Sequence, residues 1–156
     1  MIDRPIRDFM TPAPVTIDRD QTLAAAHAIM RSRRVRHLPV LDGSRLVGLV
    51  SQGDLHLIET LKDVDPATVL IEEAMSRPTY SVGPETPLAK VAASMVRHRF
   101  GSAVIVERGR VVGMFTTVDA LRALLRRAKA APSLRRRARA SGKVSGPVAA
   151  KPRRRS

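Results

Sequence analysis

Two short segments of the sequence combine a hydroxyl side chain with a carboxylate three positions later: Ser51 precedes Asp54, and Thr116 precedes Asp119. In a capping box, the hydroxyl accepts a free backbone N–H at the start of a helix while the carboxylate reaches back to the capping residue. The same geometry suits anion binding, because a helix N-terminus presents unpaired N–H groups and the positive end of its dipole. Each pair therefore has two interpretations. It is a helix cap, or it binds a phosphate while its carboxylate accepts the two hydroxyls of a ribose.

Basic side chains that could neutralise a phosphate are concentrated in the first half of the chain, where residues 33–37 contain three arginines and a histidine. In the second half, Gly101 and Ser102 stand at the positions equivalent to Arg36 and His37, and neither can carry a positive charge. We therefore expect two unequal sites, with the first half supplying more of the charge. The alternative is that these basic groups form a solvated helix end.

Both hydroxyl–carboxylate pairs belong to an internal duplication. The segment Gly48-Leu-Val-Ser-Gln-Gly-Asp54 returns as Gly113-Met-Phe-Thr-Thr-Val-Asp119, an offset of 65 residues that also relates Met10 to Met75. Each copy predicts the order strand, helix, strand, strand, helix. In the first copy these elements are a short strand at 14–17, an amphipathic helix from Leu23, a hairpin of strands 37–41 and 45–50, and a last helix from Gln52.

The duplication divides the chain into a first repeat over 1–62, a linker over 63–69, a second repeat over 70–128 and a basic tail over 129–156. A unit of about 60 residues buries only about 60% of its unfolded surface. We therefore expect the two repeats to stack their apolar faces and share a core. Their nearly continuous apolar strands predict a sheet that is covered on both faces.

Charge is unevenly distributed along the chain, whose net charge is +14. Twelve of the 28 Lys and Arg residues lie between Arg126 and Ser156, so residues 1–125 carry the remaining 16 against all 14 acidic residues. Such an acid-free tail is predicted to be disordered. It is either a polyanion-binding arm with little preference among nucleic acids or a solvating extension.

Several classes of protein do not fit the sequence. There are no cysteines, which gives no basis for disulfides or thiolate chemistry, and no apolar run reaches the length of a membrane helix. The four histidines show no HExxH spacing, and there is no GxxxxGK[ST] phosphate loop. We therefore expect a cytoplasmic protein that is not an enzyme, contacts no membrane, and has no catalytic residue and no metal site.

The tandem repeat resembles the cystathionine β-synthase (CBS) domain family over residues 2–127, as a stand-alone pair. The resemblance is carried in register by the His37-Leu-Pro-Val strand and by the two Gly-apolar-apolar-Ser/Thr-x-x-Asp endings. It implies an α/β (α+β) fold in which two β-α-β-β-α repeats pack through their sheets as one pseudo-twofold module with clefts between them. It also implies a homodimer.

The resemblance further implies a regulatory adenosyl ligand, AMP, ADP, ATP or S-adenosylmethionine, with no required cofactor, and an unknown regulated partner protein. By family position, Asp54 and Asp119 would contact ribose. The phosphate side would be formed by Ser51, Thr116, Arg34, Arg36, His37 and Arg99, and the adenine walls by Val15, Ile17, Tyr80 and Val82. The alternatives are a nucleic-acid-associated protein that uses the pair as a dimerisation scaffold and Arg126–Ser156 as its polyanion binder, and a module that has lost its ligand.

Overall fold

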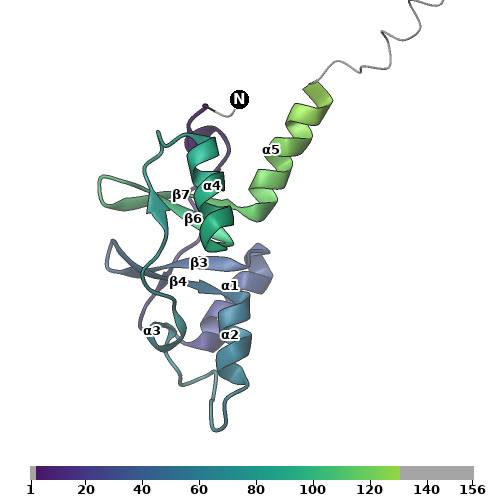
Figure 1. Ribbon diagram of the computed structural model, residues 1–156. Helices are drawn as coiled ribbons and strands as arrows, with labels where there is room; N and C mark the ends of the chain where they lie inside the picture. Colours follow the sequence, from purple (N-terminus) through teal and green to yellow (C-terminus); the bar gives the residue numbers. More distant parts are fainter. Residues whose placement is uncertain (1–2, 131–156) are drawn as a thin grey trace, which may run out of the picture.

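The computed structural model describes residues 3–130, so the predicted tail beyond Ala130 lies outside the described residues. The two halves repeat one order of elements (Figure 1). The first half contains η1 (Ile6–Asp8), β1 (Thr11–Pro12), β2 (Ile17–Asp18), α1 (Leu23–Arg33), β3 (His37–Asp42), β4 (Arg45–Ser51) and α2 (Gln52–Glu59). The second contains α3 (Ile71–Ala74), β5 (Ser81–Val82), α4 (Leu88–His98), β6 (Ser102–Glu107), β7 (Arg110–Thr116) and α5 (Thr117–Ala130).

The first long helix of each half follows the predicted apolar spacing. In α1, the buried residues are Leu23, Ala26 and Met30, which lie on one face at positions i, i+3 and i+7. The helix begins after Thr22, whose side chain accepts a hydrogen bond from the backbone N–H of Ala25 at 3.2 Å. The predicted amphipathic helix is therefore confirmed, and its apolar face points into the core.

Each half builds its own small sheet around a hairpin. Strands β3 and β4 pair antiparallel, β2 lies parallel to β3, and the order of this sheet is β2-β3-β4. The hairpin turns at Gly43, whose φ of +64° favours glycine. The second sheet has the order β1-β7-β6-β5. The predicted hairpins are confirmed, whereas the leading strands are only two residues long.

The leading segments of the two repeats cross over to the opposite half. Strand β1 pairs antiparallel with β7, and Ile6, which is fully buried, packs in one core cluster with Phe115. Reciprocally, Ile71 of α3 is fully buried in the core cluster of the first half. The apolar residues thus form two clusters, each completed by a segment from the other half, instead of the single shared core that we expected.

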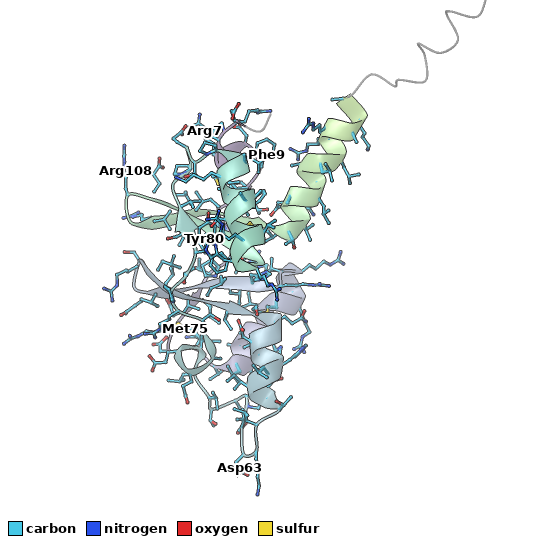
Figure 2. The ribbon with its side chains drawn as sticks, in the orientation of Figure 1. Arg7, Phe9, Asp63, Met75, Tyr80 and Arg108 are labelled. Carbon is cyan, nitrogen blue, oxygen red and sulfur yellow. The ribbon has the colours of Figure 1, made fainter. Side chains whose placement is uncertain are left out.

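Two methionine side chains pack against glycines of the opposite strands where these segments cross. A Cβ on Gly113 of β7 would overlap the sulfur and Cγ of Met10, and a Cβ on Gly48 of β4 would meet Met75 in the same way. Figure 2 shows Met75 against the first half of the molecule. A larger residue at either glycine would therefore have to displace a methionine side chain.

The helices within residues 3–130 are all too short or too polar to cross a membrane.

Candidate functional site

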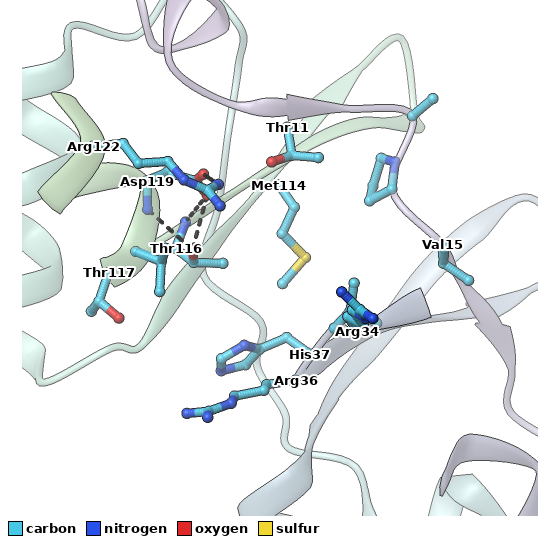
Figure 3. A pocket seen from close by; sticks show the side chains of 14 residues that line it. Thr11, Val15, Arg34, Arg36, His37, Met114, Thr116, Thr117, Asp119 and Arg122 are labelled. Atoms are coloured by element: carbon cyan, nitrogen blue, oxygen red, sulfur yellow. Dashed lines mark hydrogen bonds and ion pairs between the residues drawn. The ribbon is translucent and has the colours of Figure 1, made fainter. Parts of the chain in front are cut away.

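A cleft of about 550 Å³ opens between the two halves, within the range of small-molecule sites. Residues of the first half form one side, and the start of α5 and strand β7 form the other (Figure 3). The lining residues are Thr11, Ala13, Pro14, Val15, Arg34, Val35, Arg36, His37, Met114, Thr116, Thr117, Val118, Asp119 and Arg122.

Asp119 is the buried acid of this cleft, with 6% of its surface exposed. Its Oδ2 accepts hydrogen bonds from the backbone N–H and the hydroxyl of Thr116, both at 2.9 Å. The Asp119 backbone N–H donates to Thr116 Oγ1 at 3.4 Å. The predicted capping geometry is therefore present, and it fixes the carboxylate at the wall of the cleft.

The first half reproduces this arrangement at the start of α2. The Ser51 backbone N–H and hydroxyl donate to Asp54 Oδ2 at 2.8 and 2.7 Å, and the Asp54 N–H donates back to Ser51 Oγ at 3.1 Å. Both pairs are thus helix caps. A cap does not exclude ligand binding, because the helix N-terminus still carries the positive end of its dipole.

Arg34 enters the cleft from an unusual backbone position. It follows the last residue of α1 in the left-handed conformation, with φ 55° and ψ 43°. Arg99 holds the equivalent conformation after α4, with φ 57°. Glycine is the common residue at such helix ends, and a side chain there costs about 1–2 kcal/mol. Both repeats share this conformation, but of the two arginines only Arg34 lines the cleft.

His37 lies where the two halves meet and lines the cleft. Burial lowers its pKa below the ordinary value, the charge of Asp54 opposes that shift, and the charge of Arg36 adds to it. A Cβ added to Gly101 would lie 3.4 Å from His37 Nε2. The imidazole therefore borders the cleft, lies close enough to Asp54 to sense its charge, and also lies near the second repeat's Gly101.

Aromatic rings of the second repeat replace two of the valines that line the cleft. Tyr80 and Phe100, the equivalents of the cleft residues Val15 and Val35, stack with ring centroids 5.1 Å apart and planes 21° apart. A base inserted between two rings needs about 7 Å, because each contact takes about 3.5 Å. Tyr80, labelled near the junction of the halves in Figure 2, therefore packs on its own neighbour, and the two halves are not equivalent.

The structure brings six of the sequence-predicted residues together in one cleft: Thr116, Asp119, Arg34, Arg36, His37 and Val15. The remaining ones lie elsewhere. Ser51 and Asp54 cap α2, Tyr80 and Val82 pack against the second core cluster, Arg99 ends α4, and Ile17 is 4% exposed within the first core cluster. The cations of the first repeat therefore face the capped acid of the second.

Sequence reasoning missed Arg122, Thr11, Met114 and Thr117. Arg122 could have been found, because it stands one helical turn after Asp119 and residues at i and i+3 share a helix face. Thr11 and Met114 had no such signal, because pairing between β1 and β7 brings them to the cleft. Within residues 3–130, no group of three His, Cys, Asp or Glu is arranged to hold a metal ion.

Two repeated halves that enclose a cleft with basic side chains and one acid in its lining define a tandem-repeat module. The chain belongs to the CBS domain family, whose family model matches residues 6–57 and 71–126. The two matches coincide with the duplication seen in the sequence, so the protein is a CBS pair.

Relatives carry this pair in different contexts. The chain is 28% identical over 115 residues to inosine-5'-monophosphate dehydrogenase of Korarchaeum cryptofilum, covering 73% of this chain but 22% of that enzyme. It is 27% identical over 114 residues to the CBS domain-containing protein YhcV of Bacillus subtilis, covering 73% of this chain and 81% of YhcV. The CBS domain pair of protein MJ0100, solved with 5'-methylthioadenosine and S-adenosyl-L-methionine, superposes with a TM-score of 0.68 at 26% identity, covering 77% of this chain and 98% of that one.

Proposed function

We propose that this CBS pair is a regulatory module that binds an adenosyl ligand in the Asp119 cleft and modulates a partner protein. The single observation that carries the proposal is that one cleft joins the capped carboxylate of Asp119 to the basic side chains of the opposite repeat. The carboxylate would accept ribose hydroxyls, and Val15 would border the base. The adenosyl ligands of the MJ0100 pair support the ligand class.

The charge of the cleft favours a phosphorylated ligand. Arg34, Arg36 and Arg122 contribute three guanidinium groups, and Asp119 is the single acid among the residues that line the cleft. Guanidinium groups bind phosphate oxygens through charge-assisted and often bidentate hydrogen bonds. We therefore expect AMP, ADP or ATP to bind more tightly than the cationic S-adenosylmethionine.

Calorimetric titration of the full chain with AMP, ADP, ATP and S-adenosylmethionine tests the proposal. Saturable binding of at least one of these compounds, with the phosphorylated ones preferred, is the expected result. The absence of binding by all four at millimolar concentration would contradict it, and the capped aspartates would then have only a structural role.

Regulation of a partner also requires surfaces outside the cleft. Helix α5 leads away from the second half (Figure 1) and exposes Leu121, Leu124 and Leu125, each with 60–61% of its surface accessible. Apolar side chains gathered on one helix are typical of protein interfaces. They support the expectation of a homodimer, which analytical ultracentrifugation of the full chain would test.

The cations at the end of the chain favour a second candidate function, binding of nucleic acid. Twelve Lys and Arg residues between Arg126 and Ser156, without an acid, are enough for counterion-release binding to a polyanion. Retention on DNA that is lost when 131–156 are deleted, and that does not respond to ATP, would favour this function over ligand sensing.

A further inference from the structure

Arg122 is the cleft cation that touches the capped acid directly. Its Nη1 donates to Asp119 Oδ1 at 3.1 Å, and 63% of its side chain is exposed (Figure 3). Besides the main cleft, Arg122 and Asp119 also line a smaller adjoining cavity of about 160 Å³. The ion pair therefore lies between two hollows, and the arginine has open space on either side of it.

The acceptor capacity of Asp119 is largely used before any ligand enters. A carboxylate offers about four lone-pair positions, two on each oxygen. Both positions on Oδ2 are taken by the backbone N–H and hydroxyl of Thr116, and Arg122 takes one of the two on Oδ1. A ribose diol needs two acceptor positions, so it cannot bind fully until Arg122 releases Asp119.

A released guanidinium can bind another anion, because an arginine stays charged at any pH of interest. Arg34 and Arg36 line the same cleft and would compete with it for any other acid. The phosphate of a bound nucleotide supplies that anion, whereas adenosine leaves Arg122 facing water and two other cations.

We propose that Arg122 exchanges Asp119 for the phosphate of the ligand, so that the cleft discriminates phosphorylated from unphosphorylated adenosyl compounds. This inference rests on the proposed adenosyl binding at the same site. A ribose diol has to break this ion pair, which costs free energy. A new contact between Arg122 and the phosphate compensates for that cost. Arg122 is thus a specificity-determining residue.

The two repeats differ at this position, which provides a natural substitution. Leu57 stands on α2 where α5 carries Arg122, and it is 67% exposed. The Asp54 cap therefore has an apolar neighbour in place of a guanidinium. Leucine is consequently compatible with this helix position, and Arg122→Leu is expected to fold.

The test compares ATP and adenosine by calorimetry with the full chain. Arg122→Leu is expected to weaken ATP binding about tenfold, the low end for a lost charge-assisted hydrogen bond, and to strengthen adenosine binding about twofold. Arg122→Lys, which keeps the charge but not the planar fork, should fall between. Arg127→Leu is the matched control, because it removes the same charge from α5 at a position that lines neither cavity.

Opposite changes for the two ligands cannot arise from a merely structural role, which would weaken both. If the unmodified chain binds ATP and Arg122→Leu leaves the ATP-to-adenosine affinity ratio within about twofold of it, the exchange is wrong while the proposed function stands. A ratio that shifts equally in Arg127→Leu would also overturn it. If the unmodified chain binds neither compound, this inference is overturned, whereas the proposed function fails only if AMP, ADP and S-adenosylmethionine also do not bind.

Discussion

Substitution of the two capping acids by asparagine separates a structural role from a binding role. Asp54 and Asp119 make the same backbone and hydroxyl contacts at the start of a helix, but only Asp119 lines the open cleft. Asp54→Asn is therefore a control matched in residue type, helix position and hydrogen bonding. We expect both variants to lose stability and only Asp119→Asn to lose ligand affinity.

The size of each effect follows from the contacts. Losing the carboxylate charge at a helix N-terminus and one charge-assisted capping bond costs about 1 kcal/mol in each variant. For a domain of this size that lowers the melting temperature by about 3–5 °C. The lost ion pair with Arg122 adds only ~0.3 kcal/mol to the cost of Asp119→Asn, because 63% of the arginine side chain is exposed. Loss of a charged acceptor for ribose costs about 1.5 kcal/mol, or about tenfold in affinity for ATP.

Thermal melting and calorimetry with ATP measure the two effects on the same samples. The reasoning requires similar melting temperatures for the two variants and an affinity loss confined to Asp119→Asn. Equal affinity losses, or a larger loss in Asp54→Asn, would refute it. Either result would show that ligand binding is not confined to the cleft that Asp119 lines.

Three further predictions follow from single side chains. Because burial lowers the pKa of His37 in the folded protein, protons bind more readily to the unfolded chain. The stability of the unmodified protein should therefore fall as pH drops from about 7.5 to about 5.5. Chemical unfolding of His37→Gln should show a smaller loss of stability over the same pH range. Identical pH profiles of stability for the two proteins would contradict this role of His37. Arg34→Gly relieves about 1–2 kcal/mol of left-handed backbone strain, but the added entropy of the unfolded chain costs about 0.5–1 kcal/mol. Urea unfolding should therefore show a net gain in stability of about 0.5–1 kcal/mol, while the affinity for ATP falls about threefold. A less stable variant with unchanged affinity would show that the side chain has only a structural role. Gly113→Ala should lower the free energy of unfolding by about 1–3 kcal/mol because its Cβ overlaps Met10. Gly83→Ala, with open space around it, should change the free energy of unfolding by less than about 0.5 kcal/mol. Equal values from urea unfolding of the two variants would show that β1 is loosely packed on β7.

The local structure of the repeat was predictable from the sequence because short-range interactions determine it. Ser51 and Asp54 are three residues apart, so their capping box forms within one helical turn. Gly43 and Ser44 likewise close a hairpin between strands that adjoin in the sequence. The duplication then required the same elements twice, and the structure contains them.

The sequence by itself also determined which residue types could bind a phosphorylated ligand, but not which of them meet. That was decided by the crossing of the leading segments, which places Thr11 beside Met114, and by the packing of one half against the other, which brings Arg36 and Asp119 into one cleft. It was decided as well by the stacking of Tyr80 on Phe100. These are contacts between residues far apart in the chain. They depend on the combined shapes of two packed halves, which no periodicity or spacing within a single repeat contains.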